Sequence, residues 1–163
     1  MFLPRFCIVL FLALSHGIRA GEPPDWSRSD PVKAATVADV ILVAKILDVT
    51  VLSGKTGKPL SKIPEWVDER YQGERLRLTL ENPRVLWPVR GSIEKEVTIS
   101  WDGITSSFVT RHANSTVVLL LAKTATNRAT VYTPAHYWPI ARMSDLPAVE
   151  RAVSLRAASQ QPK

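Results

Sequence analysis

Alternating apolar and polar positions predict a protein built mainly of β-strands. Val40–Leu52 is rich in β-branched residues and apolar along its first half, as in a long strand whose beginning is buried on both faces. Glu74–Leu80 and Glu96–Trp101 alternate regularly, as half-buried strands do, and Thr116–Leu121 is apolar after its first residue, which indicates a central, fully buried strand. Ala129–Ile140 begins as a strand and is then interrupted by two prolines.

The second strand is predicted to carry a bulge or a bend. Its inward positions are Leu76, Leu78 and Leu80, but beyond Asn82-Pro83 the apolar positions are Val85, Trp87 and Val89. Because side chains alternate between the faces of a sheet, a shift by one residue must be absorbed by an irregularity at Asn82-Pro83.

Two further segments complete the expected architecture. Ser53–Gly73 is polar and rich in turn residues, and a connection of about 20 residues inside a compact domain is often functional or disordered. Asp145 is expected to cap a final helix whose apolar stripe is Leu146, Val149, Val153 and Leu155. The predicted fold is therefore a small antiparallel five-stranded OB-like barrel, with a long loop after the first strand and a C-terminal helix.

The first 20 residues have the pattern of a secretory signal peptide. Arg5 precedes a nine-residue apolar run, Phe6–Leu14, which is shorter than the roughly 20 residues needed to span a bilayer. Cleavage between Ala20 and Gly21 would remove Cys7, the single cysteine of the chain. A mature secreted chain without disulfides fits a bacterial periplasm or exterior best, and no membrane anchor is expected after cleavage.

The chain is then expected to contain one folded domain. Residues 21–33 are predicted to form an extended, proline-rich arm, 34–158 the barrel domain with its helix, and 159–163 a tail. Without Arg5 and Arg19, 19 basic residues face 15 acidic ones, so the mature net charge is +4. This charge is scattered, which argues against a nucleic-acid partner.

Four segments resemble a known family: Ala38–Ile46, Val85–Gly91, Glu96–Ile99 and Val117–Leu121. Their order and apolar pattern, over residues 36–122, are similar to secreted OB-type barrels, whose best-known members are the amino-terminal domains of tissue inhibitors of metalloproteinases. Bacterial periplasmic proteins with the same strand order are also similar. The resemblance implies a fold and no mechanism, because those inhibitors use an N-terminal cysteine that the mature chain lacks.

No motif indicates catalysis or a cofactor. The mature chain has two histidines, His112 and His136, and neither has other ligands at the spacing of a metal site, so no metal is expected. A hydrolase that uses one of these histidines is a further hypothesis, but no nucleophile motif supports it. The prediction is accordingly a protein that is not an enzyme and has no cofactor.

Aromatic and acidic side chains give the best candidates for binding. The predicted partner-binding residues lie in the long loop and between the two late prolines, and they are Glu65, Trp66, Asp68, Tyr71, Tyr137 and Trp138. Exposed Trp and Tyr are common hot spots of protein recognition. In the alternative interpretation, the aromatic side chains fold back as lids on the barrel ends, and the acidic ones belong to a solvated helical turn.

Two functions follow from this composition. The first is a secreted or periplasmic module that binds a protein partner through residues 53–73. The alternative is a binding site for a small molecule or a glycan in the mouth of the barrel, formed by aromatic side chains.

Overall fold

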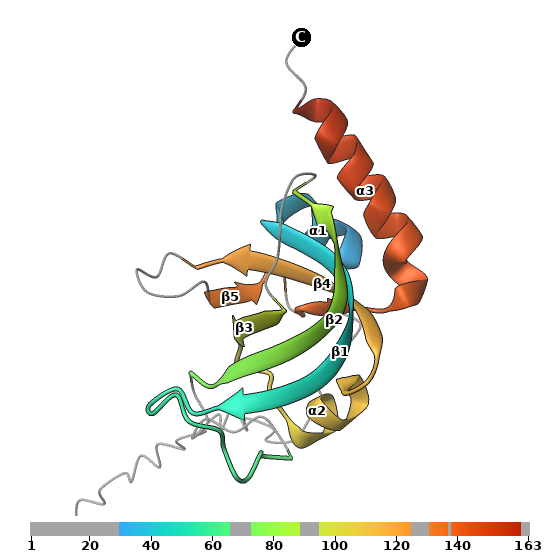
Figure 1. The fold of residues 1–163 in the computed structure, drawn as a ribbon. Coiled ribbons are helices and arrows are strands. Elements are labelled where there is room, and N and C mark those ends of the chain that lie inside the picture. The colour runs from blue at the N-terminus through green and yellow to red at the C-terminus, as the bar shows by residue number, and fades with distance from the viewer. Residues whose placement is uncertain (1–29, 66–72, 89–94, 125–130, 137, 161–163) are drawn as a thin grey trace, which may run out of the picture.

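The computed structural model describes residues 30–65, 73–88, 95–124, 131–136 and 138–160 (Figure 1). The elements are, in chain order, α1 (Pro31–Val37), β1 (Val40–Leu52), β2 (Arg75–Trp87), β3 (Glu96–Ser100), α2 (Ser106–His112), β4 (Thr116–Lys123), β5 (Val131–Pro134), β6 (Ile140–Ala141), a 3₁₀ turn η2 (Met143–Asp145) and α3 (Leu146–Ser159). No helix among these residues is long and apolar enough to cross a membrane.

Five of the strands form a closed ring. The order of the mixed sheet is β1-β2-β3-β5-β4-β6, and β1 also pairs with β4, so β1 to β5 enclose a common interior. The short strand β6 pairs with β4, and its Ile140 belongs to the ring core. The expectation of an entirely antiparallel sheet is wrong, because β3 and β5 run parallel. Parallel neighbours need a crossover, which β4 and its connections supply between β3 and β5.

The predicted irregularity at Asn82-Pro83 is confirmed. Between the pairs Val43–Arg84 and Lys45–Glu81, these two residues of β2 stand opposite Ala44 alone, and Asn82 adopts a φ of 48°. A single extra residue returns Val85 to the side of the ring interior, opposite Leu42.

A second bulge changes the position of Trp87. Leu86 is an extra residue between the pairs Leu42–Val85 and Ile41–Trp87, so Trp87 faces the outside of the ring together with Ile41. The prediction that Trp87 points inward with Val85 is therefore wrong, although Trp87 is buried, at 9% exposure. The alternation of side chains between the two faces shifts at a bulge, and no residue type near Leu86 indicates this bulge in the sequence.

The apolar residues form two cores on opposite faces of the sheet. The ring interior contains the inward residues of the strands, among them Leu42, Leu78 and Leu119. The second core lies between the outer face and the helices α1 and α3, and contains Ile41 and Leu120. Neighbouring residues of β1 and β4 are thus buried on both faces, which explains their continuous apolar runs.

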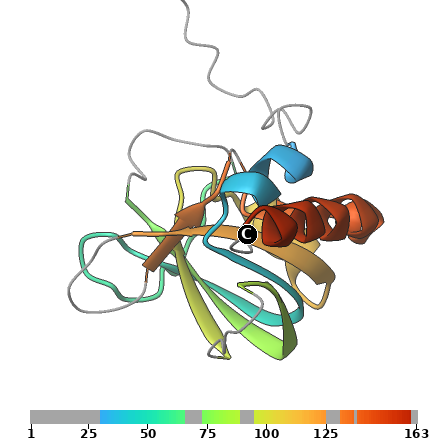
Figure 2. The same ribbon diagram turned by 90° about the horizontal axis from the view of Figure 1, so that it is seen from above.

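Helices α1 and α3 pack side by side over the outer face of the sheet, whereas α2 and the β1–β2 loop lie away from them, at the bottom of Figure 1 (Figures 1 and 2). Helix α1 begins at Pro31 and is capped by Asp30, whose Oδ1 accepts a hydrogen bond from the Lys33 amide at 2.9 Å. The sequence predicts that residues 31–33 belong to an extended arm, but the structure places them in this helix.

The final helix has the predicted location with a different buried stripe. Val149, Ala152 and Val153 are buried, whereas Leu155 is 68% exposed because it lies about 200° around the helix from Val153. Asp145 occupies the N-cap position without capping α3 through its side chain. Its Oδ2 instead accepts a hydrogen bond from the Arg142 amide at 3.1 Å, which closes the 3₁₀ turn.

Candidate functional site

The described half of the β1–β2 loop, residues 53–65, is tied to the strands by backbone hydrogen bonds. The Ser53 amide donates to the Lys58 carbonyl at 2.9 Å, and the Gly57 amide donates to Ser53 at 2.8 Å. The Leu60 amide donates to Val51 at 2.8 Å, and its side chain packs against the ring core with that of Ile63. These bonds fix the course of the loop up to the start of α2, where the Ser106 amide donates to Pro64.

The two ends of the loop touch at a pair of glycines. A Cβ atom on Gly54 would stand 2.1 Å from the carbonyl oxygen of Gly73, closer than any real contact, so this approach requires glycine at position 54. Gly73 itself has a φ of 79°, a left-handed conformation that glycine adopts without strain. The loop is therefore pinned at its base, where the chain enters β2.

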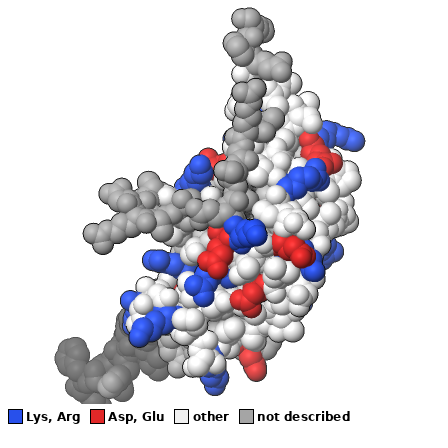
Figure 3. Space-filling model, viewed as in Figure 1, with Lys and Arg blue, Asp and Glu red and all other residues white. Residues whose placement is uncertain are grey.

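Lysine side chains project from this anchored backbone. Lys55, Lys58 and Lys62 are exposed, and Glu65 is exposed at the end of the described half. In Figure 3, blue side chains lie at the lower left, where Figure 1 places the loop. The described half of the loop is thus basic and displays polar side chains on a fixed backbone.

The predicted partner-binding residues have different outcomes. Glu65 is exposed, as a contact residue must be. Trp66, Asp68, Tyr71 and Tyr137 lie outside the described residues, as do the predicted cleavage residues Ala20 and Gly21.

Trp138 is buried, so the expectation that it is exposed for a partner is wrong. It is 5% exposed and belongs to the ring core. Its ring lies edge-on to Trp101, with 4.7 Å between centroids, and is stacked at 6.5 Å with Phe108 of α2. Trp138 thus agrees with the alternative interpretation, in which an aromatic residue closes one end of the ring.

Helix α2 carries part of this closure in a segment for which the sequence predicts no definite structure. The Thr105 hydroxyl oxygen accepts a hydrogen bond from the Phe108 amide at 3.2 Å and so caps the helix. Phe108 is 3% exposed, and its ring is 4.8 Å from that of Trp101. Among the aromatic residues of the described ranges, Trp101 is half-buried and the others are buried.

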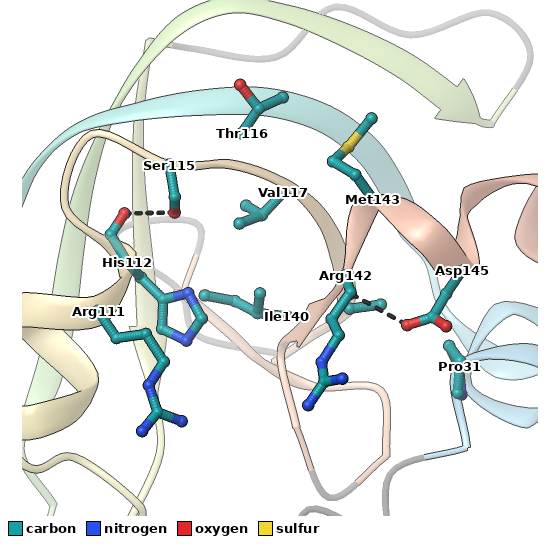
Figure 4. A pocket seen from close by; sticks show the side chains of 11 residues that line it. Pro31, Arg111, His112, Ser115, Thr116, Val117, Ile140, Arg142, Met143 and Asp145 are labelled. Carbon is teal, nitrogen blue, oxygen red and sulfur yellow. Dashed lines mark hydrogen bonds between the residues drawn. The ribbon is translucent and has the colours of Figure 1, made fainter.

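A pocket of about 610 Å³ opens between α2, β4, β6 and η2. Its lining residues are Pro31, Arg111, His112, Ser115, Thr116, Val117, Ile140, Ala141, Arg142, Met143 and Asp145. In the close view, the side chains of Arg111 and Arg142 extend toward the same side of the pocket, and the His112 ring lies beside Arg111 (Figure 4). Two elements that are distant in the sequence therefore bring two guanidinium groups to one cavity.

His112 has an unusual pKa in this environment. Burial of the ring, and to a lesser degree the positive charge of neighbouring Arg111, lowers the pKa of His112 from 6.5 to about 4. The imidazole is therefore neutral at pH 7. The formal charge of the pocket lining is then +1, from two arginines and Asp145.

The pKa of His112 predicts a loss of stability in mild acid. Between pH 6.5 and about 4 the unfolded chain binds a proton that the folded chain does not, so this contribution is complete above pH 6.5 and is lost as the pH falls toward 4. The free-energy change that follows from this pKa shift is halved here because the ring is partly exposed. We therefore expect the free energy of unfolding to fall by about 1 kcal/mol between pH 7 and 5. Urea denaturation at both pH values measures it.

The variant His112→Gln separates this effect from all other titrations. It removes the ionisable ring, so its free energy of unfolding is expected to change less than that of the wild type between pH 7 and 5. Parallel losses in the two proteins would show that another group is responsible.

In the sequence, His112 is a candidate only for catalysis or metal binding, and Arg111 and Arg142 carry no signal of a site. No local pattern could have joined them, because their proximity depends on how α2 and β6 lie beside β4. Within the described ranges, no group of three His, Cys, Asp or Glu residues is placed to hold a metal ion.

Comparison with known proteins adds no assignment. No protein-family model matches this chain. No curated protein is significantly similar to it in sequence.

Proposed function

We propose that the protein is a secreted or periplasmic binding protein, without enzymatic activity, that contacts a protein partner through residues 53–73. The observation that carries this proposal is the described half of the β1–β2 loop, which displays exposed side chains on an anchored backbone. A loop held in one conformation loses less conformational entropy on binding than a mobile one, and so retains more of its contact energy.

The exposed lysines indicate the chemistry of the partner. Lys55, Lys58 and Lys62 are concentrated in eight residues, and an acidic patch on the partner would be attracted to them. The predicted aromatic contacts Trp66 and Tyr71 follow in the same loop, and they supply the apolar centre of the proposed interface.

We also propose that the ring of five strands is a barrel of the OB type. Closure of the ring by the β1–β4 pairing supports this proposal, as does the position of the long loop directly after β1. Barrels of this type bind ligands through their loops and one face of the sheet, which is consistent with a role for the β1–β2 loop.

The test of this function is charge reversal in the loop. Deleting residues 55–62 would remove the packing of Leu60 and the pairing of Leu52 with Pro59, so substitutions are the cleaner design. The triple variant Lys55→Glu, Lys58→Glu, Lys62→Glu should capture the partner from the native envelope fraction at least ten times less well. Its melting temperature should stay within about 2 °C, because all three side chains are exposed.

A matched variant controls for net charge. Lys33→Glu, Lys95→Glu, Lys123→Glu makes the same change in charge at exposed positions outside the loop and should leave capture intact. Equal capture by the loop variant and the wild type would contradict the proposal, as would equal losses in both triple variants.

A further inference from the structure

The pocket beside α2 has features of a ligand site that is independent of the proposed partner contact. None of its lining residues belongs to the 53–73 loop. Its volume of about 610 Å³ falls in the range of sites for small molecules, which is roughly 300–1,000 Å³. We propose that this pocket binds a small organic anion that consists of a carboxylate and an apolar body.

The charged side of the pocket selects for an anion. Arg111, at the end of α2, and Arg142, directly after β6, extend toward the same side of the cavity (Figure 4). A guanidinium group presents a planar fork of N–H donors that fits the two oxygens of a carboxylate. Two such groups around one cavity favour a carboxylate over a neutral or cationic head group.

The single acidic residue of the lining, Asp145, already accepts a hydrogen bond within the protein. Asp145 Oδ2 accepts the backbone hydrogen bond from Arg142, so this carboxylate stabilises the 3₁₀ turn. His112 is neutral at pH 7 and adds no charge. The formal lining charge of +1 therefore fits a ligand with one negative charge.

The apolar part of the lining selects for the apolar body. Val117, Ile140 and Met143 line the pocket together with Ala141, and in Figure 4 the side chains of Val117 and Ile140 lie near the His112 ring. Val117 and Ile140 are buried and belong to the ring core, so packing fixes the position of their side chains, whereas Met143 is exposed. A short aliphatic chain attached to the carboxylate would cover this wall.

The first measurement is a titration followed by NMR of backbone amides. Sodium hexanoate is the probe, and hexanamide and hexylammonium chloride are the neutral and cationic controls. We expect saturable shifts at residues of α2, β4 and β6 with hexanoate, with a Kd on the order of 1 mM, since ion pairs with exposed arginines are screened by water. Both control compounds should bind at least ten times more weakly.

The variant Arg142→Gln tests the role of the guanidinium group. The backbone N–H that binds Asp145 remains in this variant and the side chain is exposed, so the fold is expected to persist, which the amide spectrum itself reports. Hexanoate should bind at least five times more weakly to Arg142→Gln. Arg151→Gln, at an exposed position of α3 outside the pocket, should bind as the wild type does.

A second pair of probes distinguishes a free acid from a protein terminus. Acetyl-Ala-Leu with a free carboxylate is compared with its C-terminal amide and with hexanoate. Tighter binding of the peptide acid would support a chain terminus as the source of the carboxylate, and tighter binding of hexanoate would support a free acid.

Three results would overturn the inference. They are no saturable shift up to 50 mM hexanoate, equal binding of hexanoate and hexanamide, and unchanged binding to Arg142→Gln. None of these results bears on capture through the β1–β2 loop, so the two proposals can fail separately.

Discussion

Replacing Trp138 by alanine should lower the free energy of unfolding by about 3–5 kcal/mol, the range for removing a buried aromatic side chain. Trp138 is 5% exposed and fills the end of the ring against Trp101 and Phe108. Alanine would leave a cavity beneath α2, because the strands on either side are held by the ring and cannot collapse into it. Urea denaturation followed by far-UV circular dichroism measures the loss.

The milder variant Trp138→Phe distinguishes packing from partner contact. Phenylalanine retains a ring at this position, so we expect it to cost less than half as much stability as alanine and to leave capture of a partner unchanged. A loss below about 1 kcal/mol in Trp138→Ala would contradict the assignment of this residue to the core. If the stable Trp138→Phe variant lost capture of the partner, Trp138 would have to be a partner contact.

Replacing Arg156 by alanine should have the second-largest effect, about 2 kcal/mol. Its guanidinium carbon lies 4.3 Å from the centre of the Trp87 ring, and its Nη1 donates to the carbonyl oxygens of Ala38 at 2.6 Å and Ala35 at 3.3 Å. One side chain thus joins α3, α1 and β2. Charge-assisted hydrogen bonds and a partly desolvated cation–π contact contribute on the order of 1–3 kcal/mol together.

Two further substitutions define the contribution of Arg156. Arg151→Ala removes an exposed arginine from the same helix and should change the free energy of unfolding by less than about 0.5 kcal/mol. Arg156→Lys retains the charge without the planar fork and should lie between the wild type and alanine. Equal stability of Arg156→Ala and Arg151→Ala would show that the contacts of Arg156 do not stabilise the fold.

The contacts of Arg156 also explain how the second core is sealed. The carbonyls of Ala35 and Ala38 lie at the end of α1, where an unpaired acceptor beside the core would be costly. Arg84 makes a comparable connection at the surface through its ion pair with Glu150 of α3 at 3.1 Å. Both side chains are exposed in that pair, so it contributes less than the bonds of Arg156.

Local patterns were sufficient wherever a segment's own residues decide its conformation. The prediction of a long first strand over Val40–Leu52 is confirmed at both bounds, and Thr116–Leu121 lies in the central strand β4. Both follow from β-branched and apolar composition. The bulge at Asn82-Pro83 could be predicted because the alternation visibly changes phase there.

Predictions failed where a distant part of the chain determines the environment. Trp87 faces outward because a second bulge follows at Leu86, and it is buried only because α1 and α3 cover that face. Trp138 has polar and proline neighbours that suggest a surface loop, yet α2 places Phe108 against it. Leu155 belongs to an apolar pattern, but it lies on the side of α3 that faces away from the second core, although Ala157 beyond it still packs against that core.

The sequence by itself therefore determined the strand-rich class, the bounds of the first strand, the first bulge and the presence of a C-terminal helix, since these depend on propensity and periodicity within short windows. Only the tertiary structure decided the closure of the ring, the parallel β3–β5 pair, the second core and the pocket that Arg111 shares with Arg142. These features depend on contacts between residues far apart in the chain, and the pattern of apolar and polar residues in either segment does not indicate such contacts.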